Sequence, residues 1–176
     1  MAKKKPAWRN RLVGSGEQPA SAFKANPANW RTHPETQQDA LEGVLRDVGW
    51  VQNVIINRRT GGRLVDGHQR IISALKQGDD TPVPYIEIDV DEAEEALILA
   101  TLDPLAAMAG TDTAALDALL RSVQTGEAGV QAMLAKLAED EGIVAPVAPD
   151  DFPVKDEHLD VEHTCPKCGY QWSGGE

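Results

Sequence analysis

The sequence has few aromatic residues, only two cysteines and no long apolar run. Phe, Trp and Tyr make up 5% of the 176 residues, so the 41% of hydrophobic residues must build a core mainly from Leu, Ile, Val and Ala. Two cysteines cannot supply a disulfide framework. No stretch approaches the roughly 18 apolar residues of a membrane span, and no apolar segment follows the N-terminal lysines as in a secretory signal. We therefore expect a cytoplasmic protein with no membrane contact.

Charge is spread unevenly along the chain. The net charge is −11, yet residues 1–16 hold five lysines and arginines and no acidic residue. Residues 24–76 are also locally basic, whereas residues 139–162 hold nine acidic residues and one lysine. Overall acidity argues against a broad nucleic-acid-binding surface but leaves room for a focused anion site in the basic half. The simplest interpretation of both charge runs is solubility.

The pattern of apolar residues predicts a mixed α/β (α+β) fold with a short mixed sheet, followed by two or three helices and a flexible acidic tail. The predicted segments are a disordered basic tail (1–20), an α/β domain (21–109), a helical extension (110–141), an acidic linker (142–162) and a C-terminal tail (163–176).

The α/β domain is predicted from turn, cap and β-branched signals. Pro84 favours a sheet edge or a strand start, and Pro104 is expected to interrupt or end the helix that Asp91 caps. The predicted strands are 22–25, 51–57, 63–65 and 83–90, with 51–57 and 63–65 as a hairpin, and the predicted helices are 33–48, 68–77, 91–100, 111–123 and 128–139.

The most informative motif is the turn Asp66-Gly67-His68-Gln69-Arg70. A short strand that leads through a glycine into a helix is a place where phosphates bind, because the first N–H groups of the helix lack internal partners. Arg70 in the first helical turn can donate two hydrogen bonds to a phosphate, and His68 and Gln69 add donors. The pattern predicts a phosphate-binding turn.

Two points about this turn stay open at the level of sequence. Asp66 would repel a phosphate, so its role is that of a ligand to metal-bound water, a hydroxyl acceptor or a clamp on Arg70. The alternative to a binding site is a plain strand–turn–helix corner, with Asp66 as the N-cap and Arg70 on the surface.

A wider set of motifs resembles the ParB N-terminal domain family, which is related to sulfiredoxin. The resemblance runs from about residue 22 to residue 108 and rests on Asn26-Pro27, Trp30-Arg31, Val48-Gly49-Trp50, Leu64 to Ile71, Ala74-Leu75 and Val83-Pro84-Tyr85. With Asp-Gly-His in the turn and the stretch 101–109 after it, the chain looks most like the short ParB-like proteins found beside DNA methyltransferases in phages and mobile elements.

The resemblance implies a nucleotide site. Family members include partition proteins that bind and hydrolyse CTP, and similar proteins use ATP or ADP. Carried over to this sequence, Gly67, His68, Gln69 and Arg70 would line the phosphate side of the pocket, and Arg31 would reach in from an earlier loop. The sequence departs from the partition proteins in two places: residues 101–105 do not match their acidic-Asn-x-x-Arg motif, and no full helix-turn-helix module follows. It departs from sulfiredoxin in one, because His68 stands where sulfiredoxin has its cysteine.

An enzyme of the same fold is the alternative, as a nucleotide hydrolase, a small-molecule kinase or a nuclease. Asp66 and His68 are the candidate catalytic residues, with Glu35 as a second carboxylate and Mg²⁺ as the cofactor. No compact catalytic constellation is visible beyond Asp66 and His68, so whether the protein is an enzyme stays open. A non-catalytic interaction module is the third hypothesis.

The C-terminal tail contains one Cys-x-x-Cys. Cys165-Pro-Lys-Cys168-Gly169 has the form of one knuckle of a zinc ribbon, but structural zinc takes four ligands. His163 and His158 are the nearest further ligands in the chain. The open alternatives are Zn²⁺ held within the chain, a site shared by two subunits, a ribbon that has lost its metal, and a redox pair.

Together these patterns predict a nucleotide-binding accessory protein that acts on or near DNA in partition, DNA modification or phage DNA metabolism. The predicted ligand is CTP, ATP or ADP with Mg²⁺, bound through Arg31, Gly67, His68, Gln69 and Arg70. DNA, a DNA-acting protein such as a methyltransferase or terminase, and a second copy of the chain are the predicted partners.

Overall fold

The computed structural model describes residues 8–143 and 163–172, which belong to two separate compact units divided after Ile143. Residues 1–7 of the predicted basic tail and nearly all of the predicted acidic linker 142–162 lie outside the described residues. Among the described residues, no helix combines the length and the apolar character needed to cross a membrane.

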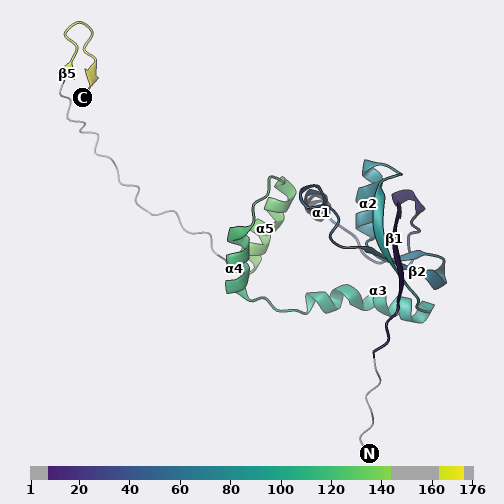
Figure 1. The fold of residues 1–176 in the computed structure, drawn as a ribbon. Helices are drawn as coiled ribbons and strands as arrows, with labels where there is room; N and C mark the ends of the chain where they lie inside the picture. The colour runs from purple at the N-terminus through teal and green to yellow at the C-terminus, as the bar shows by residue number, and fades with distance from the viewer. Residues whose placement is uncertain (1–7, 144–162, 173–176) are drawn as a thin grey trace, which may run out of the picture. The chain divides into compact units, whose positions relative to one another are not determined.

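The first unit is a mixed α/β structure built on a four-stranded sheet with the order β1-β4-β2-β3 (Figure 1). β1 is antiparallel to β4, β4 is parallel to β2, and β2 is antiparallel to β3. The predicted fold class and the predicted β2–β3 hairpin are therefore confirmed. The strands are β1 (Leu12–Pro19), β2 (Val54–Asn57), β3 (Arg63–Asp66) and β4 (Pro82–Ile88), and the helices are α1 (Glu35–Asp47), α2 (His68–Gln77), α3 (Glu92–Ala107), α4 (Thr113–Ser122) and α5 (Ala128–Asp140).

β1 corrects the prediction of a disordered tail that extends to residue 20. The strand contains Gly14, Gly16 and a terminal Pro19, and nearly all of it is exposed, so it lacks the alternation of apolar and polar residues by which a strand is found. Its order comes from pairing along β4. The strand predicted at 22–25 is replaced by a short 3-10 helix, η1 (Ala20–Ala22), and a single bridge from Lys24 to Arg63.

Two expectations based on proline are also corrected. Of the two places expected for Pro84, the sheet edge is wrong, because β4 lies between β1 and β2. Pro84 instead lies near the start of β4, and β2 pairs only with the later Tyr85–Ile88 part. The missing N–H of Pro84 therefore removes no hydrogen bond to β2. α3 continues past Pro104 to Ala107, and the N–H of Met108 donates to the Pro104 carbonyl. Only the last turn of the helix follows the proline, so little helical structure depends on the bond that it removes.

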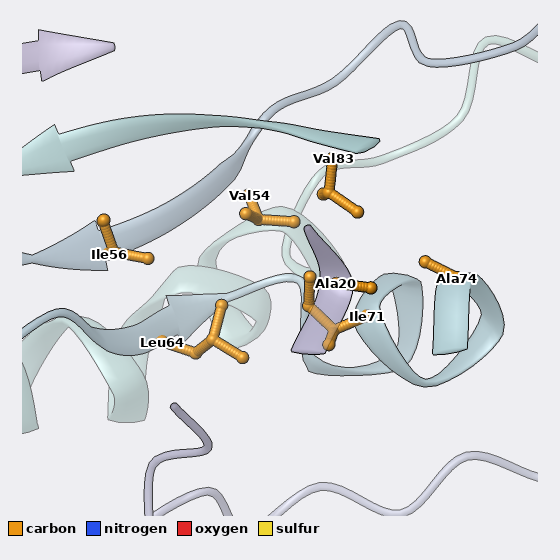
Figure 2. Close-up of a cluster of buried hydrophobic side chains, with 7 residues drawn as sticks. All are labelled: Ala20, Val54, Ile56, Leu64, Ile71, Ala74 and Val83. Carbon is orange, nitrogen blue, oxygen red and sulfur yellow. The ribbon is translucent and has the colours of Figure 1, made fainter. Parts of the chain in front are cut away.

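β2 and β3 are largely buried, with apolar clusters on both faces of the sheet, which explains why these strands are short and mainly apolar. Side chains that alternate along β2 point to opposite sides, so Val54 and Ile56 face α2 whereas Ile55 faces α3. Val65, Ile88 and Val90 form the smaller cluster on the α3 side. Figure 2 shows the larger cluster, which consists of Ala20, Val54, Ile56, Leu64, Ile71, Ala74 and Val83.

α5 packs against α1 through two glycines, beside the sheet domain (Figure 1). A Cβ built on Gly43 of α1 would lie 2.7 Å from Cγ2 of Val130, and one built on Gly129 of α5 would lie 2.8 Å from the carbonyl carbon of Asp39. Contacts this short do not occur between real side chains, so the two helix backbones approach as closely as glycine alone permits.

Gly129→Ala is therefore expected to weaken the attachment of α5 to α1. The new methyl group meets the backbone of Asp39, which cannot move aside as a side chain can, and overpacking of this kind costs about 1–3 kcal/mol. Faster hydrogen exchange of the α5 amides would report the effect. Gly126→Ala is the matched control, because its Cβ would meet no atom within 4 Å. Equal exchange in the two variants would contradict the close approach.

Candidate functional site

The predicted strand–glycine–helix turn is present between β3 and α2. Asp66 is the last residue of β3, Gly67 is the N-cap with φ 93° and ψ 19°, and α2 begins at His68. Glycine is required here for two reasons. Its φ lies in the left-handed region, and a Cβ would lie 2.6 Å from Cγ1 of the fully buried Val54. The turn thus brings the backbone of the site tightly against the core.

A cavity of about 490 Å³ opens at this turn. It gathers all five predicted binding residues in one place, including Arg31 from the loop before α1. The other walls come from that loop, α1, β2, β3 and α3, and Glu35 does not line it. The lining consists of Asn29, Arg31, His33, Gln37, Leu41, Gln52, Ile55, Val65, Asp66, Gly67, His68, Gln69, Arg70, Leu99, Leu102, Asp103 and Ala106.

Arg70 lines the cavity, and an ion pair with Asp66 holds its side chain in place. Its Nη2 lies 2.5 Å from Oδ2 of Asp66, and only 12% of the Arg70 side chain is exposed. Two details of the plain-corner alternative are wrong: the N-cap is Gly67, not Asp66, and Arg70 is not on the surface. Ligand binding by the turn stays a prediction. Of the roles open to Asp66, the structure shows the clamp.

Two nitrogen atoms of the turn are buried without a hydrogen-bond partner in the described part of the chain. They are Nε of Arg70 and Nε2 of Gln69, a residue that is only 6% exposed. Buried donors are nearly always paired in folded proteins, and a donor without a partner costs about 1–3 kcal/mol. Both residues line the cavity, so the unsatisfied donors are a feature of its wall.

His68 holds the neighbouring loop. Its Nε2 accepts a hydrogen bond from the backbone N–H of Asn26 at 3.3 Å, which fixes this nitrogen as the unprotonated one. Burial lowers the pKa of His68; the nearby Asp66 raises it, whereas His33 and Arg31 lower it further. The imidazole is therefore neutral near pH 7. Its Nε2 supports the loop that carries Arg31 and is not a free donor for a ligand.

Arg31 is paired in the same way as Arg70. It forms an ion pair with Asp103 of α3, and its guanidinium lies 5.5 Å from the ring centroid of Trp30. Sequence reasoning missed Asp103, which was visible only as part of the unusual stretch 101–105. Each arginine of the cavity thus has a carboxylate beside it, so an anionic ligand has to compete with these carboxylates or arrive with a cation.

The buried carboxylate of Glu95 stabilises the loop that carries Asn26 and Arg31. Glu95 is 4% exposed, and it accepts hydrogen bonds from the side chains of Asn26 (2.8 Å), Asn57 (2.6 Å) and Thr60 (2.7 Å). Burial alone raises the pKa of Glu95, but these three hydrogen bonds and the nearby Arg63 together lower it below 4.5. This network could not be predicted from the sequence, because Glu95 is one of three acidic residues in the first turn of α3.

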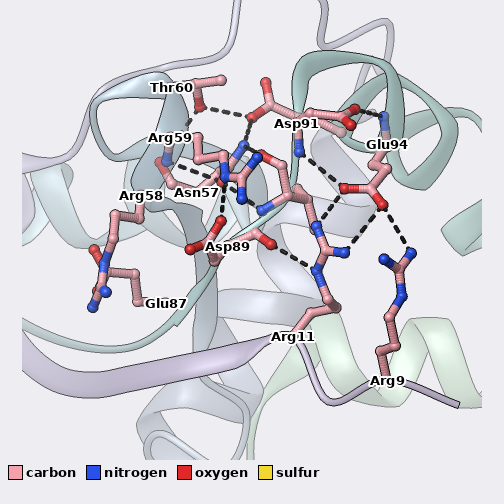
Figure 3. Close-up of polar contacts among 12 residues, drawn as sticks. Arg9, Arg11, Asn57, Arg58, Arg59, Thr60, Glu87, Asp89, Asp91 and Glu94 are labelled. Atoms are coloured by element: carbon pink, nitrogen blue, oxygen red, sulfur yellow. Dashed lines mark hydrogen bonds and ion pairs between the residues drawn. The ribbon is translucent and has the colours of Figure 1, made fainter.

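Arginines outside the cavity also form ion pairs with acidic side chains. Figure 3 shows Arg9 and Arg11 at Glu94, Arg58 at Glu87 and Arg59 at Asp89. Every arginine of the sequence lies among the described residues and has an acidic partner. The described part of the chain therefore presents no cluster of unpaired arginines to a nucleic acid.

The cysteines lie in the second unit, at the tip of a short hairpin of β5 (His163–Thr164) and β6 (Gln171–Trp172). Both thiols are free. Within residues 8–143 and 163–172, no three His, Cys, Asp or Glu residues are grouped closely enough to hold a metal ion. The predicted ligand His158 lies outside the described residues, and His163 contributes its backbone to β5.

Comparison with known proteins supports the fold. No family model matches the sequence, and no curated protein matches it at a significant level. Among solved structures, the C-terminally truncated chromosome-partitioning protein ParB from Caulobacter crescentus, complexed with CTP-γ-S, superposes with a TM-score of 0.52 at 19% identity. The match covers 62% of this chain and 62% of that one, so the chain spans about three-fifths of its length.

A second solved structure, the Pnob8-like ParB-N domain, has a TM-score of 0.45 at 18% identity and covers 76% of this chain and 51% of that domain. The superposition on the Caulobacter protein shows the fold, which is that of a ParB N-terminal domain.

Proposed function

We propose that this chain is a ParB-like nucleotide-binding accessory protein that acts on or near DNA. The observation that carries the proposal is the cavity, which brings Arg31 and the turn Gly67 to Arg70 together and contains two buried donors with no partner in the described structure. The ParB structure with the same fold holds CTP-γ-S, which supports a nucleotide as the ligand here.

The phosphates would lie at the N-terminus of α2. The backbone N–H groups there, Nε2 of Gln69 and Nε of Arg70 are donors that a phosphate can satisfy. Leu41, Leu99 and Leu102 form an apolar wall of the same cavity, suited to a base and ribose. His68 would act indirectly, because its Nε2 holds the loop of Arg31 in place.

Mg²⁺ is expected to bind with the nucleotide. The cavity arginines are matched by Asp66 and Asp103, so a free triphosphate would meet two carboxylates as well as two cations. A magnesium-bound triphosphate carries less negative charge and offers the metal to carboxylate oxygens or to water between them. We infer that Mg²⁺ raises the affinity for the nucleotide.

Calorimetric titration of the purified chain with CTP, ATP and ADP, each with and without Mg²⁺, tests the proposal. Binding of at least one nucleotide, strengthened by Mg²⁺, is the expected result. If none of the three binds in either condition, the proposal fails, and the fold serves contacts with DNA or protein alone.

Arg70→Ala is expected to weaken nucleotide binding by about 1.5–3 kcal/mol, or roughly 10- to 150-fold, because it removes a charged hydrogen bond from the phosphate side. Arg121→Ala is the matched control: Arg121 forms the same i,i+4 ion pair with Asp117, but on α4 and outside the cavity. Equal affinity of the two variants would show that Arg70 serves only the turn.

Catalysis by Asp66 and His68 stays a prediction. In the structure Asp66 is engaged by Arg70, and Nε2 of His68 accepts from Asn26, so neither is presented as a free base. Magnesium-dependent nucleotide turnover, measured on the same samples, would identify an enzyme.

The DNA part of the proposal depends on residues outside the described structure. The arginines of the described residues are engaged by carboxylates, whereas Lys3, Lys4 and Lys5 precede them without any acidic neighbour in sequence. Contact with DNA, or with a DNA methyltransferase or terminase, would therefore use the N-terminal segment. Salt-dependent DNA binding that is lost when residues 1–7 are removed is the expected result.

A further inference from the structure

The second unit presents two thiols at the tip of a hairpin. The backbone N–H of Cys165 donates to the Tyr170 carbonyl at 2.8 Å, and the N–H of Gly169 donates to the Cys165 carbonyl at 2.9 Å. Gly169, with φ 73°, supplies the left-handed residue that closes this turn. The turn therefore brings Cys165 and Cys168 together on one short loop.

The turn directs hydrogen-bond donors at the sulfur of Cys165. Backbone N–H groups of Lys167 and Cys168 and the Cys168 thiol are hydrogen-bonded to the Cys165 thiol. Thiolates are the form in which cysteines bind metal, and backbone N–H groups that point to sulfur spread its negative charge. The arrangement is thus built for charged sulfur.

We propose that Cys165 and Cys168 provide half of a tetrahedral zinc site, which the same two cysteines of a second copy of this chain complete. Zinc in structural sites takes four ligands, and the described residues of one chain bring only two together. Four thiols lose four protons to solvent as the site forms, which leaves a centre of net charge −2. This inference does not depend on the proposed nucleotide site.

Exposure and charge at the hairpin tip fit a second copy as the partner. Cys168 and Lys167 are exposed and Cys165 is partly exposed, so two tips can meet without unfolding either hairpin. Each copy brings one Lys167 within the Cys-x-x-Cys turn. Two such lysines offset the charge of −2 on a four-thiolate zinc centre, whereas a site with two histidines would be neutral and would need no compensation.

The test is the ratio of zinc to protein in the full chain, measured by elemental analysis after titration with Zn²⁺ alone and removal of excess metal. The expected result is one zinc ion for two chains, with a dimer that reverts on chelation to the state of the Cys165→Ser, Cys168→Ser double variant. His163→Ala is expected to keep this ratio. Substitution with Co²⁺ is expected to give sulfur-to-metal absorption about twice that of a two-thiolate site, because four sulfurs contact each ion.

Two results would overturn the inference. One zinc ion per chain, lost in His163→Ala, would mean that each chain completes its own site. Zinc content near zero in both the wild-type protein and the double variant would mean that the hairpin holds no metal. The metal-to-protein ratio decides between these outcomes whatever other contact two copies make.

Discussion

Gly67→Ala is expected to lower the free energy of unfolding by about 2–5 kcal/mol, through two effects that add. A left-handed φ costs an alanine about 1–2 kcal/mol. In addition, the new Cβ would lie 2.6 Å from Cγ1 of Val54, and overpacking in a core costs about 1–3 kcal/mol. Because small domains have only about 5–15 kcal/mol of stability, the variant would lose a large part of it.

Gly62→Ala separates the two effects. Gly62 has φ 80°, close to the 93° of Gly67, but a Cβ on it would meet no atom within 4 Å. Urea unfolding followed by circular dichroism should therefore show the backbone cost alone in Gly62→Ala and the larger loss in Gly67→Ala. Equal losses would mean that Val54 moves aside, and the tight contact of the turn with the core would then have no energetic role.

Glu95→Ala is the second change with a large expected effect, about 3–5 kcal/mol, typical of breaking a buried charged network. It leaves the side chains of Asn26, Asn57 and Thr60 without the acceptor that they share. Since Asn26 also contacts His68, the cavity should lose nucleotide affinity as well. Urea unfolding and calorimetry measure the two losses.

Glu92→Ala is the control for this network. Glu92 also contacts Arg63, but it is 83% exposed, and exposed ion pairs contribute about 0–1 kcal/mol. If Glu92→Ala and Glu95→Ala had the same free energy of unfolding, the hydrogen bonds of Glu95 would not stabilise the loop that carries Asn26.

The pH dependence of stability follows from the same carboxylate. The pKa of Glu95 is lower in the folded protein than its ordinary value of 4.5, so the folded state favours the ionised form. The contribution is present above pH 4.5 and is lost as the pH falls through the folded pKa. The wild-type protein should therefore lose its advantage over Glu95→Gln below pH 4.5, as seen in urea midpoints measured across that range. An advantage that stays constant would exclude Glu95 as the titrating group.

Local patterns in the sequence predicted several elements well. The turn at Gly67 and the helix from His68 to Gln77 formed as predicted, as did the Asp91 cap with Glu94. These elements depend on neighbours within a few residues, so the residues that cause them can be seen in one short stretch. β1 and the inner position of β4 could not be predicted in this way, because both depend on pairing between strands that are far apart in the chain.

For the candidate site, local sequence patterns predicted the turn from Asp66 to Arg70, and a family resemblance nominated Arg31. The ion pair of Arg31 with Asp103 and the hydrogen bond of Glu95 to the loop follow from tertiary packing. Asn26 and Glu95 are 69 residues apart, and their hydrogen bond exists because α3 packs directly against the loop, where Trp30 also donates to the Leu99 carbonyl. A carboxylate looks the same in sequence whether it faces water or a buried amide, so its role depends on the burial and the partners that folding supplies.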